Sequence, residues 1–103
     1  MPSLRMARKH KPEAPADMST VGGRIQAIRQ AFEWTQDDLA KQVGLTQPAI
    51  AGWEANKRLP KPPEGRRLCE VTGVTMDYIY RGVRAGLSLE WMAKLPADVE
   101  SVH

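Results

Sequence analysis

Gln47 carries a side-chain amide that can donate and accept hydrogen bonds at once, so it can form the paired contact that adenine offers at N6 and N7. A basic cluster follows it in the chain and consists of Lys57, Arg58, Lys61, Arg66 and Arg67, opposed by Glu64. Clustered positive side chains attract phosphate, although a solvated loop is the alternative explanation of such a cluster. These residues favour binding to a polyanion.

The residues that usually carry catalysis or hold metals are scattered in this chain. Cys69 is the single cysteine, so no intramolecular disulfide can form, and its place in a helical stretch predicts a buried small hydrophobe. His10 and His103 lie near opposite ends of the chain. Asp37 and Asp38 are adjacent acids at a helix start, where they interact favourably with the helix dipole. We therefore expect no catalytic residues, no metal site, no cofactor and no enzymatic activity.

Residues 35–56, which read TQDDLAKQVGLTQPAIAGWEAN, must position the binding groups. Thr35 and Asp38 have the spacing of a capping box, and Gly44 can adopt the positive φ found at helix C-termini. Thr46 can cap a second helix, with Pro48 in its first turn. The pattern predicts two short helices joined by a tight turn, a helix-turn-helix, and that arrangement points to DNA.

The second of these helices has two distinct faces. Ile50 and Trp53 lie three residues apart and are expected to face the core. The outer face, which a recognition helix offers to the major groove, would consist of Gln47, Pro48, Ala51, Gly52 and Ala55.

Over about residues 22–82 the chain resembles the phage repressor and Cro-like (XRE-type) helix-turn-helix family. The resemblance rests on Arg29, on TQxxLAxxVG at 35–44, on IxxWE at 50–54 and on GVTMDYIYRG at 73–82. It implies a lambda-repressor-like DNA-binding domain of five short helices. The second and third would read DNA, and the fifth often contributes to a dimer.

The resemblance also implies roles for individual residues. Gln36 matches a glutamine that contacts phosphate, and Gln47 matches a position that reads bases. Arg29 and Glu54 match a pair that forms an internal salt bridge between the first helix and the end of the third. Spacing by itself leaves these two as independent surface charges.

The chain departs from the family pattern on its outer face. Pro48 and Gly52 stand where relatives often place long polar side chains, and the capping role of Thr46 is favoured over contact with a thymine methyl or a phosphate. We therefore expect sparse direct readout, with phosphate contacts, DNA shape and a basic arm supplying further discrimination.

The remaining helices complete an all-α fold in this chain of 103 residues, which has room for one domain. Apolar residues from Val21 to Phe32 recur with helical period and predict the first helix. Two prolines at 62–63 open a fourth helix, Gly73 ends it, and Thr75 caps a fifth. The helix-turn-helix domain is expected to span residues 21–83.

The two ends of the chain lie outside this domain. Residues 1–20 are expected to form a basic flexible tail, either an arm that follows DNA or a leader without function, and they contain no signal peptide or membrane helix. Residues 84–103 form a C-terminal extension in which Ser88 can cap a short helix with Leu87, Trp91 and Leu95 on one face. That face would pack on the domain itself or meet its twin in a dimer.

The sequence therefore predicts a sequence-specific transcriptional regulator that binds double-stranded DNA. We expect a homodimer that represses by occupying a palindromic operator, and a cytoplasmic, nucleoid-associated location with no membrane contact. Two alternatives remain: an antitoxin whose C-terminal helix faces a toxin, and a protein-interaction module that has lost DNA binding.

Overall fold

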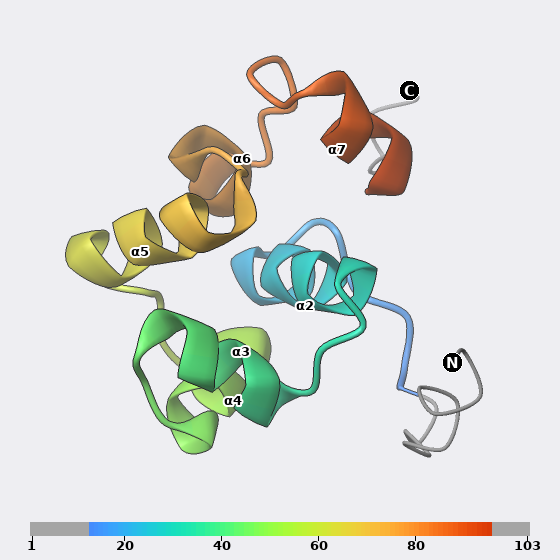
Figure 1. Ribbon diagram of the computed structural model, residues 1–103. Coiled ribbons are helices and arrows are strands. Elements are labelled where there is room, and N and C mark those ends of the chain that lie inside the picture. Colours follow the sequence, from blue (N-terminus) through green and yellow to red (C-terminus); the bar gives the residue numbers. More distant parts are fainter. Residues whose placement is uncertain (1–12, 96–103) are drawn as a thin grey trace, which may run out of the picture.

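Six helices follow one another along residues 13–95, the part of the chain that this computed structural model describes (Figure 1). They are α2 (Val21–Ala31), α3 (Gln36–Val43), α4 (Gln47–Glu54), α5 (Pro62–Thr72), α6 (Met76–Arg81) and α7 (Leu89–Lys94). No strand occurs between residues 13 and 95. The predicted all-α fold is confirmed.

The predicted helix boundaries are formed by local hydrogen bonds. The Thr35 hydroxyl accepts from the Asp38 amide at 3.0 Å, and the Asp38 carboxylate accepts from the Thr35 amide at 2.9 Å, which completes the capping box. The hydroxyls of Thr75 and Ser88 cap α6 and α7 by accepting from the amides of Tyr78 and Trp91. Gly44 ends α3 with a φ of 75°, a left-handed conformation that glycine adopts without steric cost.

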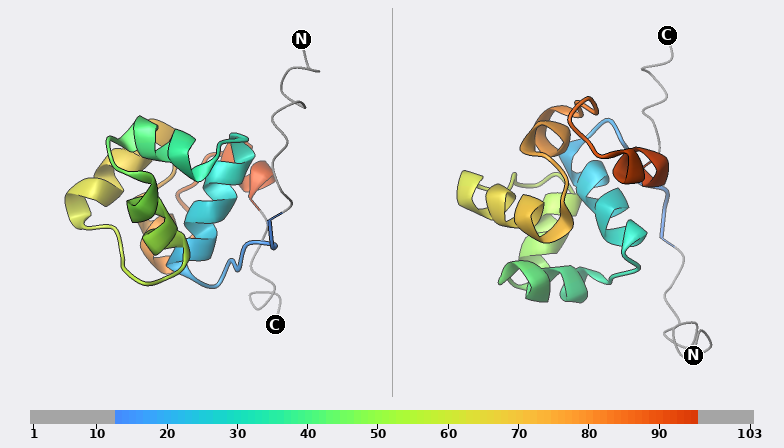
Figure 2. Two further views of the ribbon diagram at one scale, coloured as in Figure 1. Left: turned by 90° about the horizontal axis from the view of Figure 1, so that it is seen from below. Right: turned by 45° about the horizontal axis from the view of Figure 1, so that its top comes forward.

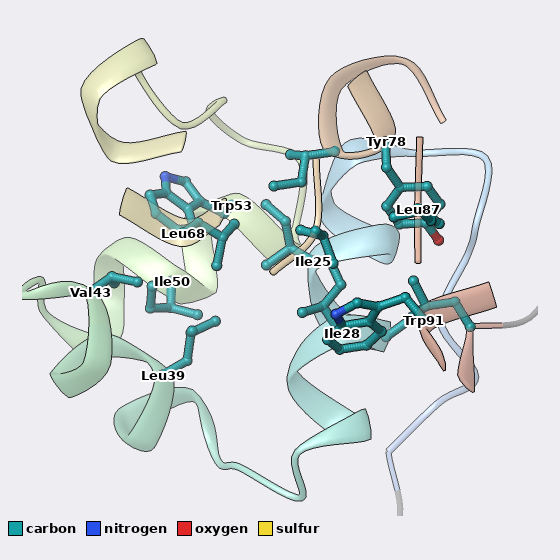
Figure 3. Close-up of a cluster of buried hydrophobic side chains, with 14 of the residues drawn as sticks. Ile25, Ile28, Leu39, Val43, Ile50, Trp53, Leu68, Tyr78, Leu87 and Trp91 are labelled. Carbon is teal, nitrogen blue, oxygen red and sulfur yellow. The ribbon is translucent and has the colours of Figure 1, made fainter. Parts of the chain in front are cut away.

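The central helix α2 packs against α4 on one side and α6 on another (Figures 1 and 2). Its Ile25 and Ile28 belong to a core that also contains Leu39, Ile50 and Trp53 (Figure 3). All five side chains are fully buried. The predicted inward orientation of Ile50 and Trp53 is confirmed. This core holds α3 and α4 at a defined angle to α2.

Gly22 permits a close contact between the start of α2 and the end of α4. Its amide donates to the Asn56 side-chain oxygen at 2.8 Å. A Cβ at this position would come 2.3 Å from the Trp53 carbonyl oxygen and 2.6 Å from that of Glu54. Because those atoms belong to backbone, any larger residue would push the two helices apart.

The apolar face of α7 is covered by the protein's own core. Trp91, which lies in the buried cluster (Figure 3), donates its indole N–H to the Thr72 carbonyl at 2.9 Å and meets the Phe32 ring edge-on at 5.5 Å. Leu87 and Leu95 are also buried, whereas Leu89 points outward. Of the two arrangements left open by the sequence, this is the intramolecular one.

The segment 13–20 runs antiparallel to α2 and is bonded to it at several points. Gln26 donates its side-chain amide to the Ala14 carbonyl at 3.0 Å, and Arg24 donates to the Met18 carbonyl at 2.9 Å. Residues 1–12, which contain the basic residues of the predicted tail, lie outside the described part of the chain. The described end of that tail thus lies against the domain.

Candidate nucleic-acid interface

The turn between α3 and α4 brings two polar helix starts close together. The Leu45 amide donates to the Ala40 carbonyl at 2.9 Å beyond the left-handed Gly44, which reverses the chain. Thr46 then caps α4, its hydroxyl accepting from the Ala49 amide at 3.4 Å. Gln36 and Gln47, each the first residue of its helix, consequently face one another.

The two glutamine side chains are hydrogen-bonded. Gln47 donates its amide N–H to Gln36 Oε1 at 2.7 Å, and Gln36 donates its own amide N–H to Glu54 Oε1 at 3.1 Å. A carboxylate can only accept, so Gln36 must turn its nitrogen to Glu54 and its oxygen to Gln47. Gln47 therefore retains one N–H and its oxygen for another partner.

Arg29 and Glu54 form the ion pair that the resemblance implies, and the pair is bidentate. Arg29 Nε lies 2.7 Å from Glu54 Oε2, and Nη2 lies 2.8 Å from Oε1, with the two side chains 1% and 6% exposed. Burial alone would lower the pKa of Arg29, but hydrogen bonds to Glu54 and Glu13 outweigh it and raise that pKa above its ordinary value. The guanidinium is therefore charged at any pH the protein meets.

Glu13 is a partner of Arg29 that sequence reasoning missed. Its two carboxylate oxygens accept from Arg29 Nη2 at 2.6 Å and from Nη1 at 3.1 Å. It stands 16 residues before Arg29, in a segment rich in proline and outside the family resemblance. No periodicity or motif could have indicated this contact, because it depends on the path of the chain along α2.

The outer face of α4 is short and open, as the sequence indicates. Gln47 and Pro48 are exposed at its start, with the capping residue Thr46, while Ala51 and Gly52 are half-buried. A Cβ at Gly52 would lie 3.5 Å from Arg58 Cγ, so the stem of Arg58 lies along this face. The missing side chain at Gly52 thus brings a cation next to the helix, which the sequence did not reveal.

Part of the basic cluster lies in the loop between α4 and α5, whereas Arg66 and Arg67 lie on α5. Lys57, Arg58 and Lys61 are all exposed there, and Arg58 makes a long ion pair of 3.7 Å with Glu64. Asn56 adopts a positive φ of 59° directly after α4, and its side chain is held by the Gly22 amide. The loop therefore leaves α4 in a defined direction, with the stem of Arg58 beside Gly52.

Residues 13–95 were also compared with the requirements of a metal site, a reactive cysteine and a membrane-spanning helix. No group of three potential metal-ligating side chains comes together there. Burial, together with the nearby charge of Glu70, raises the pKa of the Cys69 thiol, which disfavours the reactive thiolate. None of the helices in this part of the chain has the length and apolar character to span a bilayer.

Comparisons with known proteins agree with this geometry. The sequence profile of the helix-turn-helix family matches residues 25–79. The crystal structure of the P22 c2 repressor protein in complex with synthetic operator 9T, in the presence of Tl+, shares 30% identity, with a TM-score of 0.60 over 62% of this chain and 97% of that chain. The solution structure of the P22 c2 repressor DNA-binding domain (1–76) shares 28% identity, with a TM-score of 0.57 over 69% and 90%.

The chain has no significant match among curated proteins. The family profile nevertheless covers more than half of the sequence, and the capped helices, the turn at Gly44 and the buried Arg29–Glu54 pair form a single scaffold. The chain therefore belongs to the phage-repressor-like helix-turn-helix family of DNA-binding transcription regulators.

Proposed function

We propose that the protein is a repressor that binds a palindromic operator as a homodimer, with α4 in the major groove. The hydrogen bond from Gln47 to Gln36 carries this proposal, because it leaves Gln47 one donor and one acceptor. Those are the groups that adenine N7 and N6 require. The similar P22 c2 repressor has been solved with a synthetic operator, which supports the same class of partner here.

The proposed DNA contacts divide into two kinds. Gln47 reads a base, and Thr46, Pro48, Ala51 and Gly52 line the groove around it. Gln36 and the basic residues Lys57, Arg58 and Lys61 contact phosphate, which supplies affinity without sequence preference. Two copies with their α4 helices about 34 Å apart would read successive half-sites. Occupying such an operator excludes polymerase, and the protein would act in the cytoplasm with the nucleoid.

Selection of bound duplexes from a random pool, repeated at about 50 and 200 mM salt, tests the proposal directly. We expect an inverted repeat with half-sites about one helical turn apart. Binding without any sequence preference would overturn it and favour a protein-interaction module. The antitoxin alternative has less support, because Trp91, on the apolar face of α7, is buried and donates to the Thr72 carbonyl of α5.

Replacing Gln47 with alanine should weaken discrimination at one A·T pair of each half-site by about 1–3 kcal/mol, because both hydrogen bonds to adenine are lost. Competition binding between the selected duplex and its single-pair variants measures this. Gln42→Ala is the matched control: it removes an exposed glutamine of α3 that is outside the Gln47–Gln36–Glu54 hydrogen bonds. If both variants discriminate as the wild type does, Gln47 does not read a base.

Replacing Lys57 with glutamine should weaken binding to every duplex about equally. For the proposed dimer, the slope of log K against log salt should fall in magnitude by about two, because each of the two subunits loses one phosphate contact. Lys94→Gln, on α7 and far from the loop after α4, removes the same charge and should leave the slope unchanged (Figure 1). Equal slopes for the two variants would mean that Lys57 faces solvent in the complex.

A further inference from the structure

We propose that Glu13 is a positioning residue for DNA reading by Gln47, acting through Arg29, Glu54 and Gln36. The inference rests on the proposed function of Gln47. Five side chains from the segment 13–20, α2, α3 and α4 form one continuous set of hydrogen bonds, running Glu13, Arg29, Glu54, Gln36, Gln47. Glu13 stands at one end of it and the base-reading amide at the other.

Arg29 has every one of its N–H donors engaged. Nε and one N–H of Nη2 bond to Glu54, while the second N–H of Nη2 and one of Nη1 bond to Glu13. The remaining Nη1 donor bonds to the Trp34 carbonyl at 2.8 Å. Two carboxylates thus hold the planar guanidinium from two edges, which restricts both its position and its tilt.

Glu54 Oε1 transmits this restriction to the glutamines. The same oxygen accepts from Arg29 Nη2 at 2.8 Å and from Gln36 Nε2 at 3.1 Å. If the guanidinium tilts, this oxygen moves, and the bond that directs the Gln36 amide lengthens. Gln36 is then free to turn its amide, and Gln47 loses the oxygen to which it donates.

Glu13 is needed because Glu54 and Trp34 cannot satisfy Arg29 alone. Without the Glu13 carboxylate, one N–H of Nη1 and one of Nη2 lose their acceptor on a side chain that is only 1% exposed. A buried donor without a partner is costly, so the guanidinium would shift toward water. Glu13 itself is 37% exposed and can be replaced without opening a cavity in the core.

The segment that carries Glu13 has its own attachments to α2. Ala14 and Met18 accept hydrogen bonds from Gln26 and Arg24 through their backbone carbonyls, which a change at Glu13 leaves intact. Replacing Glu13 with glutamine therefore perturbs the guanidinium while the segment stays in place. It also removes a negative charge, so attraction to phosphate should be unchanged or stronger.

The experiment compares wild type, Glu13→Gln and Asp17→Asn. Asp17 lies on the same segment, and asparagine there removes the same charge while keeping the oxygen that accepts from Ser19. The probes are the duplex selected by the wild-type protein, that duplex with the A·T pair assigned to Gln47 changed to G·C, and a duplex of random sequence. The ratio of affinities is measured well below the melting temperature, where a loss of folded protein affects all probes equally.

We expect Glu13→Gln to reduce discrimination between the first two probes by about three- to tenfold, part of the roughly five- to 150-fold that a bidentate contact supplies. Its affinity for the random duplex should not fall, and Asp17→Asn should match the wild type. In a Gln47→Ala background, Glu13→Gln should change discrimination no further. In the free protein, Glu13→Gln should also shift the side-chain amide NMR signals of Gln36 and Gln47.

Several results would overturn the inference. Discrimination by Glu13→Gln equal to that of the wild type would do so, as would equal loss of affinity for all three probes, which indicates a purely structural role. Unchanged NMR signals of the Gln36 and Gln47 amides would reject the positioning role without reference to DNA. If the wild-type protein itself does not discriminate, the proposed function fails and the inference fails with it.

Discussion

Replacing Arg29 with methionine is expected to destabilise the protein by about 3–5 kcal/mol, because it leaves the Glu54 carboxylate buried without its cation. Methionine retains much of the apolar stem, so the loss reflects mainly the charge and its hydrogen bonds. A domain of this size has a total stability of about 5–15 kcal/mol, so this loss is a substantial share of the free energy of unfolding. Urea denaturation followed by circular dichroism measures the difference.

Two further variants make this test specific. Arg81→Met removes an exposed arginine whose i,i+4 partner Asp77 lies at 3.2 Å, and it should cost no more than about 1 kcal/mol. Glu54→Ala should cost less than Arg29→Met, because Arg29 keeps its pairing with Glu13. Our account of the buried pair is wrong if Arg29→Met and Arg81→Met unfold at the same urea concentration.

Replacing Trp91 with alanine is expected to cost about 3–5 kcal/mol, although α7 lies outside the region matched by the family profile. The indole is 7% exposed, packs edge-on against Phe32 and donates to the Thr72 carbonyl. Its removal opens a cavity between α2, α5 and α7 and leaves a backbone carbonyl without its partner. Thermal unfolding and urea denaturation both report the loss.

Leu89→Ala is the matched control on the same helix. Leu89 is 85% exposed, so its truncation should change stability by no more than about 0.5 kcal/mol. Equal effects of the Trp91 and Leu89 variants would mean that α7 does not belong to the folded core. A large effect of Leu89→Ala that depends on protein concentration would instead reveal an interface between two copies.

Features that depend on neighbouring residues were predictable from the sequence. The capping box of Thr35 and Asp38, the cap at Thr46 and the left-handed turn at Gly44 all follow from residue types a few positions apart. The inward positions of Ile50 and Trp53 follow from helical period. Such features are determined by the sequence because the groups that make each one are close in the chain.

The Arg29–Glu54 ion pair is a contact between residues that are distant in the sequence. Residue spacing could not distinguish a buried bidentate pair from two surface charges, and only the resemblance to repressors implied it. The two residues are 25 positions apart and meet because the core packs α2 against α4. The bond between Gln36 and Gln47 likewise depends on how the turn at Gly44 places two helix starts.

Other features were decided only by the tertiary structure. The apolar face of α7, which includes Trp91, had to be buried, but any apolar surface of the right shape could have covered it. The sequence therefore did not determine which surface covers this face. Glu13 gave no signal at all, because its contact with Arg29 arises from the antiparallel path of residues 13–20 along α2. Hydrophobic period and capping specify which groups must be satisfied locally, while the packing of distant segments decides which partners satisfy them.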